Sequence, residues 1–167
     1  AVRIQNANFR LDVSSAAAIT LGIYHDGAWE SSPSFVLRRS ASFDSVGSVK
    51  ILRNDPSVVV ARLGLLASGA TSNPCTLDIA LHRGHQTACC VYTPSGSTTG
   101  TFSIRASAVT ACTAVTGGIE QTTADAAGNK WFILSTSAAT DDLINGYRTT
   151  TAAVTEREAF ALGMFST

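Results

Sequence analysis

The feature that most constrains this chain is an alternation of apolar and polar residues with a period of two. It is clearest in 76–83, where Leu77, Ile79 and Leu81 face one way and the intervening residues face the other. A strand places successive side chains on opposite faces, whereas a helix repeats about every 3.6 residues. The pattern therefore predicts strands, over 2–13, 19–23, 49–53, 58–66, 76–83, 87–93, 101–106, 130–135 and 158–165.

Turn signals separate these segments. Gly, Asn, Asp and Ser cluster between the apolar runs, and all four prolines lie in such clusters, where a missing N–H does not interrupt a ladder. Short strands joined by regular turns are typical of a sandwich or a barrel, and the alternation with this turn spacing favours the sandwich. The predicted turns lie at 26–27, 32–33, 54–56, 68–69, 73–74, 83–84, 94–96, 117–118, 128–129 and 145–146.

The sequence thus predicts an all-β protein, an antiparallel two-sheet β-sandwich of the jelly-roll or supersandwich kind, with little or no helix. Its 167 residues fit one domain, which at this length buries about two-thirds of the surface of the unfolded chain. We expect a single β-sandwich domain over 1–167. Because the first residue is Ala1 and not Met, we expect either that the initiator Met was removed or that this is a segment of a longer chain, and the strand-like opening is in keeping with the segment.

Two segments fit the alternation less well. Residues 155–158 have the form of a helix capping box and are followed by alanines, so a short helix over 155–162 is the alternative to the strand at 158–165. Residues 107–129 are rich in Ala and Thr and poor in large hydrophobic residues. We predict a weak strand and long loops there.

The charge balance excludes several classes of partner. Twelve basic and twelve acidic residues cancel, and charged residues make up only 14% of the chain. This leaves no field to gather nucleic acid and no basic patch for anionic lipid. No apolar run approaches the ~20 residues that cross a bilayer, so we expect no membrane insertion. Low net charge removes a safeguard against self-association, which favours a homo-oligomer or a subunit of a larger assembly.

The four cysteines are Cys75, Cys89, Cys90 and Cys112, and their spacing matches no zinc-binding pattern. Cys89 and Cys90 are neighbours in a predicted strand, so their side chains point to opposite faces and are poorly placed to bond each other. We expect small buried hydrophobic side chains. The alternative is a disulfide from Cys75 or Cys112 to one of the pair.

The most site-like stretch is the predicted hairpin tip that contains His25, Asp26, Trp29 and Glu30. An aromatic ring can stack on the apolar face of a sugar, while carboxylates accept hydrogen bonds from its hydroxyl groups. The same residues also suit a structural hairpin turn. We expect these four residues to form a surface that contacts a ligand or a partner.

Other polar clusters point less clearly to chemistry. His82 and His85 would bind a metal only if their turn folded them together, and the end of a strand is expected to splay them apart. The segment 125–129 lacks the alternating oxygen ligands of a calcium loop and is predicted to be a β-turn. Arg62 lies in the apolar run 58–66, predicted to be buried on both faces, and there requires a partner. We expect no cofactor and no metal.

Several segments resemble the β-rich domains of minor tail proteins of tailed bacteriophages. The chain departs from that pattern at 85–90, where such proteins continue with an aromatic and an acidic residue. The resemblance implies a structural role in the virion, near the tail tip or baseplate, among other tail proteins. It implies no catalytic residues. The resembling segments are 26–29, 49–56, 58–63, 77–84 and 125–133.

Three functions follow as hypotheses. The first is a structural virion protein of a phage tail tip or baseplate, which mediates assembly and host-surface attachment. The alternative is a carbohydrate-binding module that recognises cell-envelope glycans. The third is a polysaccharide-active enzyme, for which the only candidate catalytic residues are Tyr24, His25 and Arg83. We therefore expect a protein that is not an enzyme.

Overall fold

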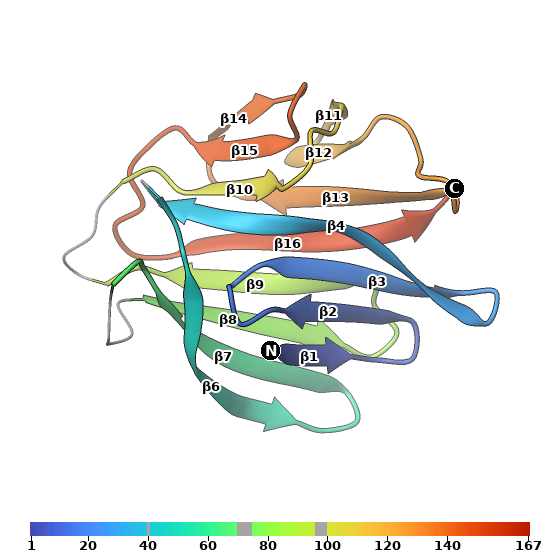
Figure 1. The fold of residues 1–167 in the computed structure, drawn as a ribbon, viewed down its shortest axis with the longest axis horizontal. Helices are drawn as coiled ribbons and strands as arrows, with labels where there is room; N and C mark the ends of the chain where they lie inside the picture. Colours follow the sequence, from blue (N-terminus) through green and yellow to red (C-terminus); the bar gives the residue numbers. More distant parts are fainter. Residues whose placement is uncertain (40, 70–74, 96–99) are drawn as a thin grey trace.

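The computed structural model describes residues 1–39, 41–69, 75–95 and 100–167 and contains sixteen strands in two antiparallel sheets (Figure 1). Within these ranges the chain forms no helix, so the predicted all-β sandwich is confirmed. None of the described segments is a helix long and apolar enough to span a bilayer. The turn predicted at 73–74 and the end of the one at 94–96 lie outside the described residues.

The front sheet, nearer the viewer in Figure 1, has the strand order β1-β2-β3-β4-β10-β15-β14, and β5 pairs with the end of β4. Strands β1 to β4 follow one another as a meander. Strand β10 follows β9 of the back sheet, and the β14–β15 hairpin follows β13 of the back sheet. The strands are β1 (Val2–Gln5), β2 (Phe9–Val13), β3 (Ile19–His25), β4 (Ala28–Arg39), β5 (Ala41–Ser42), β10 (Ser103–Ala106), β14 (Ala139–Asp142) and β15 (Tyr147–Thr150).

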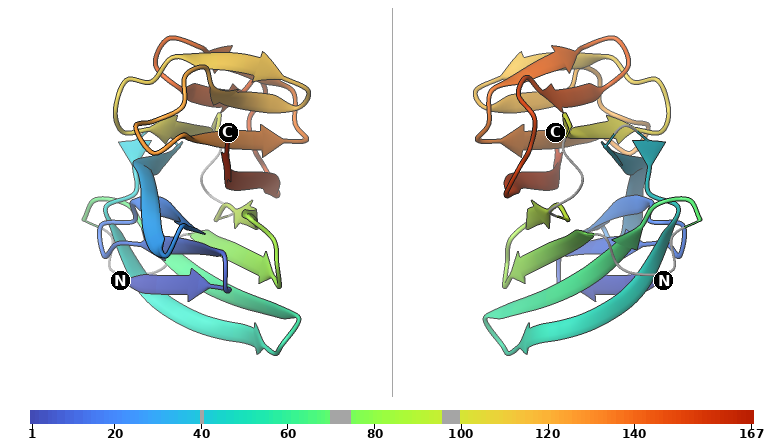
Figure 2. Two further views of the ribbon diagram at one scale, coloured as in Figure 1. Left: turned by 90° about the vertical axis from the view of Figure 1, so that its right-hand side faces the viewer. Right: turned by 90° about the vertical axis from the view of Figure 1, so that its left-hand side faces the viewer.

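The back sheet has the order β11-β12-β13-β16-β9-β8-β7-β6. Figure 2 shows the two sheets as separate layers facing each other. The longest strand at any sheet edge is β6, which pairs with β7 on one side only. The strands are β6 (Ser45–Asn54), β7 (Val58–Leu66), β8 (Cys75–His82), β9 (Thr87–Thr93), β11 (Cys112–Val115), β12 (Gly118–Gln121), β13 (Asn129–Ser135) and β16 (Glu158–Ser166).

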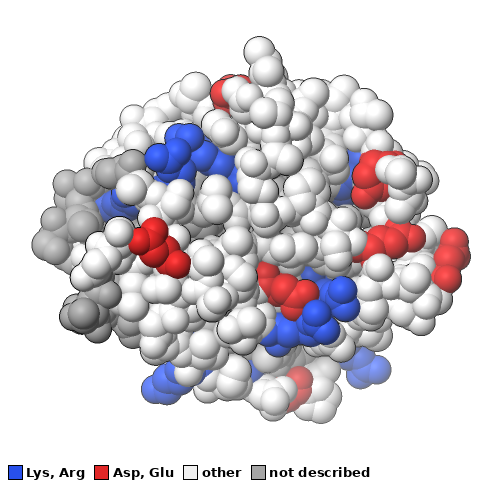
Figure 3. Space-filling model, in the orientation of Figure 1, with Lys and Arg blue, Asp and Glu red and all other residues white. Residues whose placement is uncertain are grey.

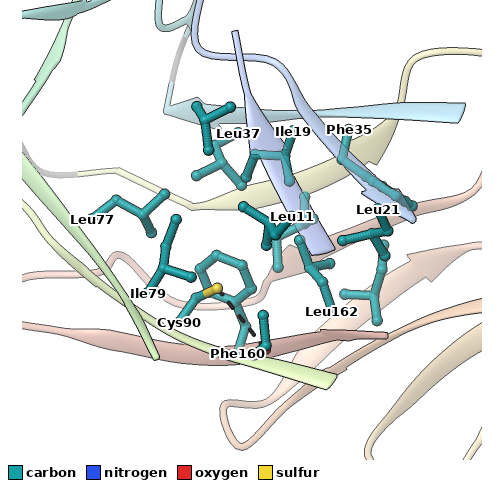
Figure 4. Close-up of a cluster of buried hydrophobic side chains, with 14 of the residues drawn as sticks. Leu11, Ile19, Leu21, Phe35, Leu37, Leu77, Ile79, Cys90, Phe160 and Leu162 are labelled. Carbon is teal, nitrogen blue, oxygen red and sulfur yellow. Dashed lines mark hydrogen bonds between the residues drawn. The ribbon is translucent and has the colours of Figure 1, made fainter. Parts of the chain in front are cut away.

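The core lies between the sheets and is built from the alternate apolar residues of both. In Figure 4, Leu11 and Leu21 of the front sheet face Ile79 and Leu162 of the back sheet, and all four are almost wholly buried. The alternation predicted in 76–83 is confirmed, because every second residue of β8 from Cys75 to Leu81 is buried. Burial of these side chains supplies the main driving force for pairing the two sheets.

Two predictions of secondary structure from the sequence are wrong. Ser32 and Pro33 do not form a turn but lie inside β4, where both residues stand opposite Leu21 in a β-bulge. A bulge tolerates proline because the ladder is already interrupted there. The helix alternative at 155–162 is also wrong, since β16 begins at Glu158, whose side chain is buried and accepts a hydrogen bond from the Ser137 hydroxyl at 2.6 Å.

Residues 107–129 contain more order than predicted. They include a hairpin of two short strands, β11 and β12, which continues the back sheet beyond β13. The segment 125–129 is a turn as expected, because Asp125 Oδ1 accepts hydrogen bonds from the backbone N–H groups of Ala127 and Asn129, each at 2.9 Å.

All four cysteines are free thiols, so the disulfide alternative is wrong. Cys75, Cys90 and Cys112 are buried as expected, and burial raises the pKa of Cys75 and of Cys112 to about 11. Cys89 is exposed instead, because its neighbour Cys90 points into the core and consecutive strand residues face opposite ways.

Strand β7 is not buried on both faces as predicted. Its side chains Ala61, Leu63 and Leu65 face the core, whereas Arg62 is half exposed on the outer face of the back sheet. Its partner is Asp78 on β8, which accepts from Arg62 Nε at 2.7 Å and from Nη2 at 2.8 Å. The charge is therefore paired at the surface across two neighbouring strands.

Candidate functional site

The predicted hairpin tip forms between β3 and β4. Asp26 and Gly27 both have positive φ, +48° and +81° respectively, which is the backbone of a two-residue type I′ turn and follows the right-handed twist of the strands. Glycine adopts such a φ without steric cost, and aspartate tolerates it better than most residues. The Asp-Gly pair therefore fixes the register, with His25 opposite Ala28.

This register separates the four predicted site residues. Trp29 stands opposite Tyr24, and both side chains lie on the outer face of the front sheet. Glu30 stands opposite Ile23, whose side chain is in the core, so Glu30 and His25 lie on the inner side, at the rim of the sandwich. The hairpin thus brings His25, Asp26 and Glu30 together but places Trp29 on the opposite face.

On the inner side, polar groups connect the hairpin to the back sheet. His25 lies between two carboxylates, with Nδ1 3.5 Å from Glu30 Oε1 and Nε2 3.6 Å from Asp26 Oδ2. The side-chain amide of Asn129 on β13 donates a hydrogen bond to Glu30 Oε2. Asn129 is wholly buried, and its Oδ1 accepts from the Ser166 hydroxyl at 3.1 Å. The Glu30 carboxylate therefore connects the two sheets, and one of its oxygens is already hydrogen-bonded to Asn129.

On the outer face, Trp29 is part of an aromatic and cationic stack. The Tyr24 and Trp29 ring centroids are 5.4 Å apart, tilted by 58°. The guanidinium carbon of Arg10, from β2, lies 4.6 Å from the centroid of Trp29. Tyr24 is 46% exposed, whereas Trp29 is partly covered. We call Arg10, Tyr24 and Trp29 the aromatic stack.

Gly22 makes the position of Arg10 possible. It lies opposite Arg10 in the register of β2 and β3, and a Cβ placed there would come within 2.9 Å of Arg10 Cγ and Nε. The arginine side chain thus lies flat over the glycine on its way to Trp29. Among the described residues Arg10 Nε has no hydrogen-bond partner, and the nearest carboxylate oxygen, Asp12 Oδ2, is 3.6 Å away.

Charged and hydroxyl groups continue from the aromatic stack along the same face. Asp12 Oδ1 accepts a hydrogen bond from Arg3 Nε at 2.6 Å, and Asp12 stands opposite Thr20 of β3. A cavity of about 480 Å³ begins there and is lined by Arg3, Asp12 and Thr20, among others. These donors and acceptors lie further along the same face, since the lining of the cavity does not include Arg10, Tyr24 or Trp29.

The histidine pair of the β8–β9 turn lies closer together than expected. The rings of His82 and His85 are 5.4 Å apart between centroids, and both side chains are exposed. The side-chain amide of Asn6 donates to the backbone carbonyls of both histidines, at 2.9 and 2.8 Å, and so holds the turn. In the described part of the chain, no group of three or more His, Cys, Asp or Glu side chains is placed to bind a metal.

Two residues of the site were not predicted from the sequence. They are Arg10, which contacts Trp29 on the outer face, and Asn129, which contacts Glu30 on the inner side. Arg10 alternates with Phe9 and Leu11, a signal that it points outward, but that signal does not reveal that it reaches Trp29 from a third strand. Asn129 was predicted only as a turn residue. Its contact with Glu30 spans 99 positions of sequence, and no local pattern indicates it.

No family model matches the chain, and no curated protein matches it. Solved structures share its fold. An α-mannosidase from Enterococcus faecalis aligns with 98% of this chain at 6% identity and a TM-score of 0.62, over 29% of that chain. A glycoside hydrolase of family 81 from Clostridium thermocellum aligns with 98% at 12% identity and 0.57, over 22% of that chain.

An α-N-acetylgalactosaminidase from Bifidobacterium bifidum aligns with 99% of this chain at 10% identity and a TM-score of 0.58, over 36% of that chain. The present chain thus spans about a third or less of each of these proteins. At such identities the likeness establishes the fold alone: a β-sandwich that also occurs as part of larger chains named as glycosidases.

Proposed function

We propose that this chain is a carbohydrate-binding module that recognises cell-envelope glycans through the outer face of the front sheet. The observation that carries the proposal is the aromatic stack. The exposed Tyr24 ring and the uncovered part of Trp29 offer apolar surface to the C–H groups of a sugar, and Arg10, which lies over the Trp29 ring, can act as a hydrogen-bond donor. Asp12 and Thr20 supply an acceptor and a hydroxyl group on the same face.

The proposed activity is binding without turnover. His25, the residue of the hairpin best suited to proton transfer, lies on the inner side and is placed between Glu30 and Asp26. It therefore faces away from the ligand that we place on Trp29. The named activities of the α-mannosidase and the α-N-acetylgalactosaminidase are in keeping with a carbohydrate ligand, although the shared part is only a fraction of each protein.

A glycan array followed by titration calorimetry on the strongest glycan tests this proposal. We expect Trp29→Ala to weaken binding up to about tenfold, since an aromatic contact contributes about 0.5–1.5 kcal/mol. His25→Ala serves as the matched control, because it alters the same hairpin on the side away from the stack. Failure of the wild type to bind any glycan, or equal binding by wild type and Trp29→Ala, would exclude the site.

A second candidate function is that of a structural component of a phage tail tip or baseplate, located in the virion. Strand β6 favours it. This edge strand exposes Val49, Ile51 and Leu52, of which Ile51 is 53% exposed, and a long apolar edge strand can pair with another chain. Recognition of a host glycan would be compatible with this setting.

Light scattering on the purified chain and mass spectrometry of purified tails test the second candidate. We expect the wild type to associate and Ile51→Asp to shift the population toward monomer, because the charge would be buried in the new sheet contact. Thr113→Asp, on the exposed side of the opposite edge strand β11, is the control. A monomeric wild type that is missing from tail particles would contradict it.

A further inference from the structure

A second region of the front sheet carries an ordered array of polar side chains, away from the aromatic stack. Strands β10, β15 and β14 are neighbours in that order, and their register aligns outward-facing residues in two rows. Ile104 and Arg148, which alternate with them, are buried on the inner side. The first row is Arg105, Tyr147 and Asp142; the second is Thr149 and Thr140, next to the buried Ser103.

A shallow groove of about 690 Å³ lies over this array. Thr140, Tyr147 and Thr149 line it from the sheet, and Leu143 and the highly exposed Ile144 line it from the β14–β15 turn. We call this the β14–β15 groove. In Figure 3, which views the front-sheet face, charged side chains stand in small separate groups on a largely uncharged surface. Binding at the groove would therefore depend on its own few charges.

Arg105 is positioned to donate hydrogen bonds into the groove. Its guanidinium carbon lies 4.5 Å from the Tyr147 ring centroid, and its Nε donates to the Ser103 hydroxyl at 3.2 Å. An arginine stacked on a ring keeps the donors at the edge of its guanidinium plane available to a ligand. The side chains of Thr140 and Thr149 make no hydrogen bond within the described part of the chain, so their hydroxyl groups are also available.

Asp142 supplies a fixed negative charge at the other end of the first row. Its Oδ2 accepts from the side-chain amide of Asn145 at 2.8 Å, and its Oδ1 accepts from the backbone N–H groups of Asn145 and Ile144 at 3.0 and 3.1 Å. These hydrogen bonds, the Asn145 side chain first, hold the pKa of Asp142 below its ordinary value. The carboxylate therefore stays charged at neutral pH.

This pairing of opposite charges across one ring determines which ligands fit. Asp141 also lines the groove but is paired with Arg148 at 3.0 Å, so the opposite charges of Asp142 and Arg105 balance and the groove offers no net field to an anionic or a cationic ligand. A hydroxyl group accepts from Arg105 and donates to Asp142, while C–H groups contact Tyr147 and Ile144. We propose that the β14–β15 groove is a second binding site, for a neutral saccharide unit, built from residues distinct from the aromatic stack.

Amide NMR titration of the isotope-labelled full chain tests this inference. The probes are methyl α-mannoside, methyl β-galactoside and N-acetylglucosamine, with glucuronate and glucosamine as charged counterparts. We expect at least one neutral probe to shift the amides of Arg105, Thr140 and Tyr147, with at least fivefold weaker binding of both charged sugars. Shifts by no neutral probe, or equal binding of glucuronate, would overturn the inference.

Variants separate this groove from the proposed site at the hairpin. Tyr147→Ala should abolish the shifts in the groove, and the matched aromatic control Tyr24→Ala should preserve them. Thr149→Val, which removes a hydroxyl at nearly constant shape, should weaken binding at least twofold even if Tyr147→Ala unfolds the edge. Persistence of the shifts in both Tyr147→Ala and Thr149→Val would exclude the groove, whatever Trp29→Ala does at the hairpin.

Asp142→Asn gives a test of selectivity. The substitution removes the negative charge but keeps an acceptor oxygen for the turn, so glucuronate should now bind at least threefold more tightly than it binds wild type. Unchanged rejection of glucuronate by a folded Asp142→Asn variant would show that Asp142 does not select the ligand, and would contradict the proposed recognition of neutral sugars by charge.

Discussion

Gly22 shows how a single missing side chain shapes the proposed site. Its outer face is covered by the side chain of Arg10, which crosses it to reach Trp29. Any larger residue would have to displace an arginine whose Nε is already buried. The glycine is therefore required by a contact between three strands rather than by an unusual backbone conformation.

Gly22→Ala is expected to weaken glycan binding about two- to fivefold, because it moves Arg10 away from Trp29 and a cation–π contact of this exposure contributes about 0.5–1 kcal/mol. Titration calorimetry with the glycan identified on the array measures this loss. Ser31→Ala, an exposed position of β4 opposite Gly22, is the control. Unchanged affinity in a variant with a native melting temperature would show that Arg10 does not take part.

Asp55 makes the β6–β7 turn sensitive to acid. It accepts hydrogen bonds from the Ser57 hydroxyl at 2.6 Å, from Arg53 Nε at 2.5 Å and from the Ser57 N–H at 2.9 Å. These interactions, the Ser57 hydroxyl first, hold the pKa of Asp55 far below its ordinary value. The stabilisation is present above the unfolded-state pKa of about 3.9 and is lost as the pH falls through the lower folded-state pKa.

The expected result is that hydrogen exchange at the Ser57 and Val58 amides, corrected for its intrinsic pH dependence, stays protected at mildly acidic pH. Protection should begin to fall near pH ~4 and be lost progressively as the pH drops through the lower folded-state pKa. Asp55→Asn should show weaker protection that does not change over the same range. Loss of protection in the wild type at mildly acidic pH would contradict the lowered pKa.

The hairpin residues show what sequence can and cannot reveal about a site. The Asp26-Gly27 turn and the polar character of His25, Trp29 and Glu30 could be predicted, because they are local. Their division between two faces depends on the register, which one residue of slip would reverse. Arg10 lies on a different strand from Trp29. Its contact with Trp29 could not be predicted before the order of the strands was known.

Strand β4 continues through Ser32 and Pro33, where the sequence predicts a turn. The Ser32 side chain replaces the interrupted ladder, since its Oγ accepts from the buried Leu21 N–H at 3.0 Å and donates to the Pro33 carbonyl at 2.6 Å. The proline therefore costs β4 little in hydrogen bonding. Sequence alone predicts a turn here because Ser-Pro initiates many turns.

Ser32→Ala is expected to destabilise the fold by about 1–3 kcal/mol, because it leaves the buried Leu21 N–H without its partner. Urea unfolding followed by tryptophan fluorescence measures the loss. Ser34→Ala, two residues further along the same strand, breaks only an exposed hydroxyl contact with Ser107. It should reduce the free energy of unfolding clearly less than Ser32→Ala does. Equal effects of the two substitutions would mean that the bulge does not depend on the serine.

For the complete fold, the two layers could be predicted from the sequence but the strand order could not. Alternation marks β8 as a strand from local sequence alone, whereas for β16 it only favours a strand over the alternative of a short helix. Their neighbours follow from contacts between distant segments, as when β16 at the end of the chain pairs with both β13 and β9. Such pairings depend on how all apolar faces are buried together, which no single segment encodes.

Asn129 offers a test of how the layers are held together at one end. Asn129→Ala removes the donor to Glu30 and the acceptor for Ser166, and we expect a loss of about 1–3 kcal/mol of folding free energy. Thermal unfolding and hydrogen exchange at Ile23 and Tyr24 measure it. Asn145→Ala, which breaks a bond within one surface turn, should cost less. A native-like Asn129→Ala with unchanged exchange would contradict this role.

The alternation of inward and outward residues also affects how this protein can evolve. Along β2 and β3 the inward residues Leu11 and Leu21 hold the fold, while the outward residues Arg10, Asp12 and Thr20 form the surface proposed to bind. The two sets are interleaved yet independent at nearly every position. Mutation can therefore explore new ligand specificities on one set while selection for folding acts on the other, and Gly22 is a position where the two demands meet.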